Sequence, residues 1–105
     1  MQIQVNTDRN VEGREALAAQ VEAMVTKSMS HFSGHVTRVE VHLSDENGDK
    51  HGQNDKRCMM EARVEGRQPT AVTCEAATLT QAVAGAADKL KSVLESTLDR
   101  LHPHR

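Results

Sequence analysis

Two cysteines and six histidines are the side chains of this chain that could carry nucleophilic, redox or metal chemistry. Cys58 and Cys74 fall at inward-facing positions of two alternating stretches separated by a short turn, so we expect them on adjacent strands and near each other. Two cysteines do not make the disulfide framework of a small secreted domain. We therefore expect buried, inert thiols rather than a redox or nucleophilic pair.

The histidines show no metal-binding spacing. They are His31, His35, His42, His51, His102 and His104. None belongs to a helical i, i+4 pair of the zinc-protease kind, so we expect solvated imidazoles and no metal site. Protonation of all six would move the formal charge from −2 to +4. We hypothesise that affinity for polyanions therefore rises as the pH falls toward about 6.

A polar segment at residues 44–55 carries four acidic residues against one lysine, a net charge of −3. Asp45, Asn47 and Asp49 have the spacing that opens an EF-hand loop. Lys50 stands where that loop needs glycine, so we expect a turn-rich connection and no calcium site. The chain also lacks a Ser-His-Asp order, a phosphate-cradling glycine loop and a converging carboxylate pair, so we expect neither an enzyme nor a cofactor.

Basic residues gather modestly toward the C-terminal end, where Lys89, Lys91 and Arg100 fall on the polar side of one predicted helix. Binding to a phosphate backbone requires several such groups on one face. A solvated helix face explains the same residues, and both interpretations stay open on the pattern alone. Phe32 is the only aromatic residue, so the chain has no platform on which single-stranded bases could stack.

Hydrophobic periodicity predicts the elements that position these side chains. Alternation typical of strands occurs at 2–7, 36–43, 56–65 and 70–76, and apolar steps of three and four typical of helices occur at 14–31 and 78–101. Thr78 is suited to cap the second helix, and Gly34 to end the first.

The order βαβββα predicts an α+β two-layer sandwich, with two helices packed on one face of a four-stranded sheet. Short turns make the last three strands antiparallel, and the strand–helix–strand start places the first strand parallel to a neighbour. At 105 residues we expect a single domain, 1–105. The sequence contains neither a signal peptide nor a long apolar stretch, so we expect a soluble, cytoplasmic protein without membrane contact.

With these features the chain resembles the hibernation-promoting factor and ribosome-associated inhibitor A family, once named sigma-54 modulation proteins, over nearly its whole length. Near the start the similar residues are Met1-Gln2-Ile3, Asn10-Val11-Glu12, Glu15-Ala16-Leu17, Val21, Lys27 and Phe32. In the second helix they are Ala82-Val83, Gly85, Asp88-Lys89-Leu90, Leu94 and Asp99-Arg100-Leu101. No motif is sharp alone, but their order and spacing are specific.

The resemblance implies a translation inhibitor that acts under stress or in stationary phase. Family members bind the decoding region of the small ribosomal subunit and block the path of mRNA and tRNA. Lys27, Lys89 and Arg100 fall where the family places basic residues that face rRNA, and Lys91 adds a cation on another flank. The partner expected is the small subunit and its rRNA, read by shape and phosphates. We expect no DNA binding, and a monomer away from the ribosome.

Several positions depart from the family pattern. Ser92, Ser96 and His102 stand where the family usually has basic residues, and Thr80 replaces an aromatic residue. A second hypothesis is therefore a member that keeps the fold but acts as a protein-interaction module, through its open sheet face or its acidic loop. A salt titration separates the two hypotheses. If the affinity for the small subunit falls steeply with salt, ribosome binding through rRNA is favoured, and if no binding occurs at low salt, the protein-interaction module is favoured.

Overall fold

The computed structural model describes residues 1–8, 13–45 and 55–101, with side chains up to Leu98. The elements are β1 (Gln2–Thr7), α1 (Arg14–Ser28), a short 3-10 helix (Ser30–Phe32), β2 (Val36–Asp45), β3 (Lys56–Val64), β4 (Thr70–Ala76) and α2 (Leu79–Leu101). The predicted order βαβββα is confirmed. Most of the predicted 44–55 loop lies outside the described residues, as do His51, His102 and His104.

The first helix is shorter than predicted, because α1 ends at Ser28 rather than at residue 31. Met29 leaves the α-helical region with φ −97° and ψ 8°, and its carbonyl accepts from the N–H of Phe32 at 2.9 Å. This bend turns both Met29 and Phe32 into the core. The apolar period runs on through these residues, which is why the sequence pattern does not reveal the break.

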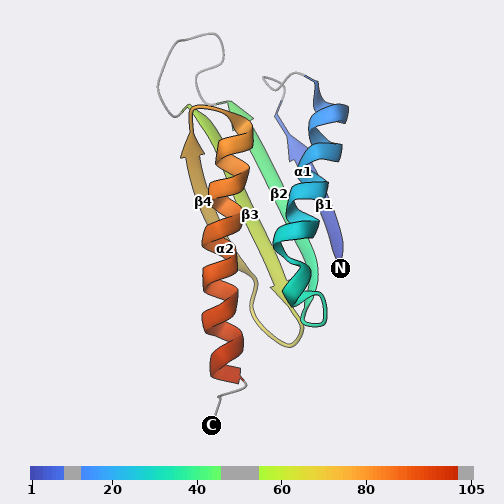
Figure 1. The fold of residues 1–105 in the computed structure, drawn as a ribbon, viewed down its shortest axis with the longest axis vertical. Helices are drawn as coiled ribbons and strands as arrows, with labels where there is room; N and C mark the ends of the chain where they lie inside the picture. The colour runs from blue at the N-terminus through green and yellow to red at the C-terminus, as the bar shows by residue number, and fades with distance from the viewer. Residues whose placement is uncertain (9–12, 46–54, 102–105) are drawn as a thin grey trace.

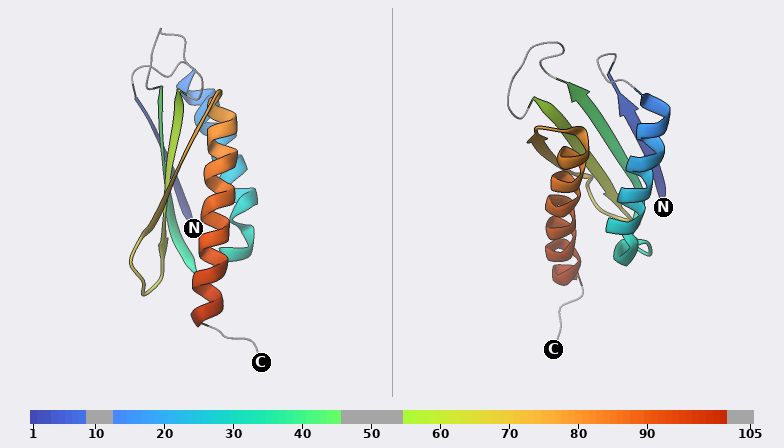
Figure 2. Two further views of the ribbon diagram at one scale, coloured as in Figure 1. Left: turned by 90° about the vertical axis from the view of Figure 1, so that its left-hand side faces the viewer. Right: turned by 45° about the horizontal axis from the view of Figure 1, so that its top comes forward.

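The four strands form one sheet in the order β1-β2-β3-β4. β1 pairs with β2 in parallel, and the other pairs are antiparallel, as predicted. Figure 1 shows α1 and α2 side by side on one face of the sheet, and the edge-on view in Figure 2 shows the opposite face without a covering helix. This is the predicted two-layer sandwich.

The two ends of the sheet differ, and we name them by their connections. The hairpin end holds residues 65–69 between β3 and β4, and the loop end holds Asp8, Asp45 and Asp55. Both helices begin at the loop end and run toward the hairpin end (Figure 1). The Glu65 N–H donates to the His35 carbonyl at 2.9 Å, which ties the segment after α1 to the hairpin.

The core lies between the helices and the sheet. Its fully buried members include Val21 and Val25 from α1, Met60 from β3 and Leu90 from α2. Burying an apolar side chain of this size contributes about 1.5–3 kcal/mol. α1 and α2 thus present their apolar stripes to the alternate, inward-facing residues of the strands, as the periodicities predict.

α2 lies close to the sheet because its first half is built from small residues. Ala82 and Ala86 are fully buried, and Gly85 faces the β4 residue Cys74 so closely that an added Cβ would lie 2.4 Å from the sulfur. Thr78 caps the helix as predicted, since its Oγ1 accepts from the N–H of Gln81 at 3.1 Å. Such a cap contributes about 1 kcal/mol.

Neither helix, within the part of the chain that the structure describes, combines the length and apolar character needed to cross a membrane.

Candidate RNA-binding surface

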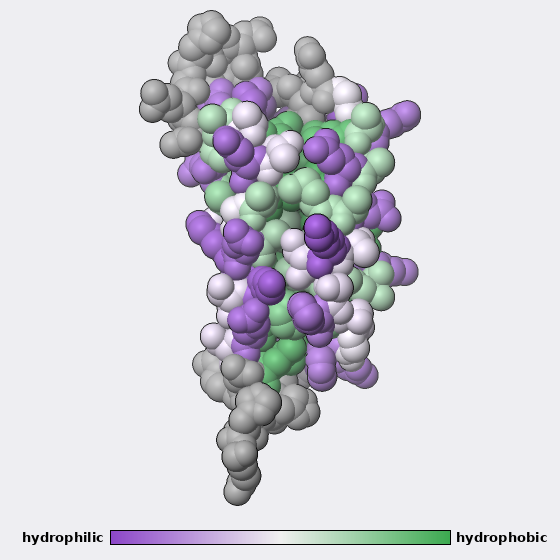
Figure 3. Space-filling view, viewed as in Figure 1, coloured by the Kyte–Doolittle hydropathy of each residue, from purple (hydrophilic) through white to green (hydrophobic). Residues whose placement is uncertain are grey.

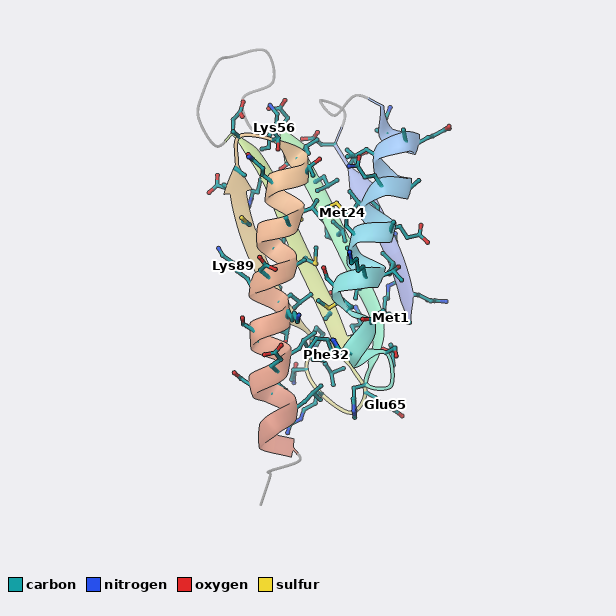
Figure 4. All side chains as sticks on the ribbon, viewed as in Figure 1. Met1, Met24, Phe32, Lys56, Glu65 and Lys89 are labelled. Carbon is teal, nitrogen blue, oxygen red and sulfur yellow. The ribbon has the colours of Figure 1, made fainter. Side chains whose placement is uncertain are left out.

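Lys89 lies on the flank of α2 that faces the free edge of the sheet. Its Nζ donates to the carbonyl oxygen of Thr73 in β4 at 2.8 Å, and Figure 4 shows the side chain on the side of α2 away from α1. The ammonium group is bound to a neutral carbonyl rather than to a carboxylate, and the residue remains exposed. Lys89 therefore lies at the surface without a neighbouring carboxylate among the described residues, while it covers a carbonyl of the edge strand.

Lys91 occupies the opposite flank of the same helix. At about 100° per residue, two positions turn the side chain by about 200°, from the β4 side to the side of α1. On α1, Met24 lies between the two helices (Figure 4), and Lys27 follows it by three positions, close to one turn. Lys27 and Lys91 therefore border the furrow between α1 and α2 from its two sides.

The two lysines also lie at similar heights along this furrow. α1 and α2 begin at the same end of the sheet (Figure 1), and Lys27 and Lys91 come thirteen and twelve residues after their first residues. At about 1.5 Å per residue, these positions lie about 20 and 18 Å along their helices. Neither lysine forms an ion pair with any residue that the structure describes.

The predicted set of four cations is thus divided by α2. Lys27 and Lys91 share the furrow, whereas Lys89 lies across the helix, beside β4. Arg100 belongs to the last turn of α2, eleven residues after Lys89, and its side chain is outside the described part. Figure 3 shows hydrophilic side chains interspersed with apolar surface over both helices, rather than one continuous hydrophilic patch.

The open sheet face carries charges that neutralise each other. Glu40 in β2 lies 3.3 Å from Arg38 Nε, 3.7 Å from His42 Nε2 and 4.0 Å from Arg63 NH2. Arg38 also donates to the side-chain oxygen of Gln4. Because Arg38 and Arg63 lie beside carboxylates, they are less available to an anionic partner than the lysines of the helix face, which form no ion pair with a described residue.

Acidic side chains gather at the loop end. Lys56 Nζ lies 3.0 Å from Asp45 and 3.3 Å from Asp55, and its hydrogen bond to Asp45 raises the pKa of Lys56. Asp8 lies beside them, since one of its carboxylate oxygens accepts from the Asp45 N–H at 3.4 Å. This described cluster of three carboxylates around one ammonium group is net negative, which disfavours an anionic partner at that point.

The two cysteines lie where the alternating pattern predicts, as register partners on β3 and β4. Both thiols are free, and Cys58 is buried whereas Cys74 is half-buried. Burial raises the pKa of the Cys58 thiol to about 12. A thiol with so little thiolate at neutral pH is a poor nucleophile. Among the described residues, no group of three or more His, Cys, Asp or Glu side chains could hold a metal ion.

A groove at the hairpin end has no counterpart in the sequence-based expectations. It has a volume of about 510 Å³ and lies between the hairpin and the last turns of α2, with Arg67 on one wall and Thr97 on the other. The sequence pattern identified Gly66–Pro69 only as a turn. The left view of Figure 2 shows that α2 continues past the end of the strands while the hairpin bends away from it, which leaves space between the two.

Solved structures with the same fold include two from bacteria. The crystal structure of the Thermus thermophilus Protein Y N-terminal domain superposes with a TM-score of 0.72 at 23% identity, over 92% of this chain and 99% of that one. A ribosomal subunit interface protein from Coxiella burnetii gives a TM-score of 0.68 at 12% identity, over 92% and 97%. These similarities confirm the fold. Comparison with curated protein sequences finds no significant match.

The sequence itself matches a family model. The model describes sigma 54 modulation proteins and S30EA ribosomal proteins, and the match covers residues 4–102. It begins within β1 and runs through the end of α2, so it covers all or part of every element that the structure describes. The resemblance noted in the sequence is thereby confirmed, and the chain belongs to the family of sigma 54 modulation proteins and S30EA ribosomal proteins.

Proposed function

We propose that this protein binds the small ribosomal subunit through rRNA and inhibits translation by occupying the decoding region, where it blocks mRNA and tRNA. Membership of the S30EA family supports a ribosome-associated role. One observation on the chain itself carries the proposal: Lys27 and Lys91 lie on the two sides of the furrow between α1 and α2, at similar heights. Both lack ion pairs in the described structure, so both can contact phosphate without first losing a partner.

The helix face suits folded rRNA better than single-stranded RNA. The one aromatic side chain, Phe32, is 5% exposed, so bases cannot stack on it. Recognition of a folded RNA by shape and phosphate needs cations at fixed positions on a rigid support. Two helices packed on a sheet provide that support, with Lys27 and Lys91 in the furrow and Lys89 on the outer flank of α2.

Co-sedimentation with ribosomes from starved cells, on sucrose gradients over a range of salt, tests the proposal. We expect the wild-type protein to travel with the small subunit and its affinity to fall steeply with salt. The double variant Lys27→Glu with Lys91→Glu should lower the affinity by about 100-fold. Each lost phosphate contact is taken as about tenfold, which corresponds to about 1.4 kcal/mol. We expect a similar loss for Lys89→Glu with Arg100→Glu.

The matched control is Arg14→Glu, a charge reversal at an exposed residue at the start of α1, near the loop end. It should leave co-sedimentation unchanged. If both double variants bind as strongly as the wild-type protein, the proposal that this surface binds rRNA is wrong. A wild-type protein that does not bind the subunit even at low salt would favour a protein-interaction module on the open sheet face instead. Occupation of the decoding region is tested separately, by competition with tRNA for the bound subunit.

A further inference from the structure

We propose that the groove at the hairpin end is a second RNA contact, in which Arg67 binds a backbone phosphate. The inference rests on the proposed function, because it extends the same RNA surface beyond the furrow. Its evidence is separate and consists of the shape, charge and position of the groove.

The lining of the groove is suited to a sugar–phosphate chain. Arg67, Gln68, Thr70 and Thr97 supply a guanidinium, an amide and two hydroxyl groups, and Val64 and Pro69 add an apolar base. A guanidinium matches the oxygens of a phosphate in a two-pronged geometry, and amide and hydroxyl groups can bond ribose hydroxyls. With a volume of about 510 Å³, the groove has room for a nucleotide-sized group.

The charge of the groove favours an anion. Arg67 forms no ion pair with a described residue, and no acidic side chain belongs to the described lining. Glu65, the nearest acid in the turn, lies on the α1 side of the hairpin and away from α2 (Figure 4). An exposed arginine that no carboxylate engages keeps its donors available for a phosphate.

The groove lies at the hairpin end of the molecule, near the same end of α1 as Lys27. Lys27 lies in the last turn of α1, and beyond that turn the hairpin and Thr97 of α2 line the groove. Thr97 follows Lys91 by six residues on α2, which is about 9 Å along the helix axis and about 240° around it, so Thr97 faces the hairpin rather than the furrow. The furrow and the groove therefore lie on two sides of the last turns of α2, close enough for one folded RNA to contact both.

The test measures binding of the full chain to purified small ribosomal subunits at several salt concentrations, for Arg67→Gln and for Arg14→Gln. The two arginines are both exposed, and they lie at opposite ends of the molecule. We expect Arg67→Gln to weaken binding by about tenfold and to reduce the slope of log K against log salt by about 1, as for the loss of one phosphate contact. Arg14→Gln should change neither quantity.

A second variant, Thr97→Glu, places a carboxylate on the other wall of the groove and should weaken binding more than Arg67→Gln does. Circular dichroism of each variant checks that the fold is retained. If Arg67→Gln and Thr97→Glu both bind as the wild-type protein does, the groove contact is wrong. If the double variant Lys27→Glu with Lys91→Glu nevertheless loses binding, the proposed function through the furrow still holds. Weaker binding by Arg67→Gln with an unchanged salt slope would mean that the groove contacts ribosomal protein, which also overturns the proposal. If the wild-type protein does not bind, both proposals are wrong.

Discussion

Replacing Gly85 with alanine tests how closely α2 is packed against β4. In the middle of a helix this change normally stabilises a protein by about 0.5–1 kcal/mol, because glycine loses more backbone entropy on folding. Here the new Cβ would lie 2.4 Å from Cys74 Sγ, well inside van der Waals contact. Overpacking of this kind costs typically about 1–3 kcal/mol, so we expect Gly85→Ala to lower the free energy of unfolding by about 1 kcal/mol.

Removal of the sulfur should reverse the sign of this effect. In a Cys74→Ala background the nearest atom to the new methyl group is the Cβ of residue 74, at the ordinary contact distance of 3.5 Å. Gly85→Ala should then stabilise the protein by about 0.5–1 kcal/mol, as helix propensity alone predicts. The coupling energy between the two positions is therefore expected to be about 1.5–2 kcal/mol, within the range that contacting residues show.

The four proteins of this double-mutant cycle are the wild type, Gly85→Ala, Cys74→Ala and the double variant. Their free energies of unfolding are measured in urea by far-UV circular dichroism, because the chain has no Trp or Tyr to serve as a fluorescent probe. Ala84→Gly, at the neighbouring exposed position, is the matched control. It should cost about 0.5–1 kcal/mol in both backgrounds. If Gly85→Ala stabilises the wild-type protein, or has the same effect with and without the Cys74 sulfur, the argument that Gly85 is required for close approach is wrong.

Two further predictions concern pH. The native Cys58 thiol keeps its proton up to about pH 12, while an unperturbed thiol has a pKa of 9.0, so the native state holds more protons between these values. The contribution of this thiol to the free energy of unfolding should be fully present below about pH 9. It should fall by up to about 1.4 kcal/mol per pH unit between pH 9 and about pH 12. Urea titrations should show a shallower fall for Cys58→Ala than for Cys74→Ala, and equal slopes would contradict the burial argument. Binding to small subunits should strengthen between pH 7.5 and 6 as imidazoles gain charge, and a flat affinity would remove that hypothesis.

Much of the fold could be predicted because each element carries its own period. The strict alternation in β3 sends Cys58, Met60 and Ala62 to the core, and all three are fully buried. A strand slipped by one residue would expose all of them, so the pattern fixes the register strongly. The end of α1 was less predictable, because the apolar residues at Met29 and Phe32 continue the helical period through a bend that only packing against the sheet requires.

The candidate site was predicted only in part, because helical periodicity gives angles around one helix but not its neighbours. The sequence alone shows that Lys89 and Lys91 diverge by about 200°, and not which of them faces α1. That depends on the order β1-β2-β3-β4, which places α1 and β4 on opposite sides of α2. Arg67 was missed for a similar reason, since its groove is formed with Thr97, which lies thirty residues later in the chain.

An acidic protein can still bind RNA when its charges are separated in space. The carboxylates of Asp8, Asp45 and Asp55 lie at the loop end, whereas Lys27 lies near the hairpin end and Arg67 in the hairpin itself. The ten residues of β2 connect these ends and span about 33 Å. Since the Debye length is about 10 Å at 0.1 M salt, the acids scarcely weaken an RNA contact at the hairpin end. The local pattern of unpaired cations, rather than the formal charge of −2, therefore decides where a phosphate backbone can bind.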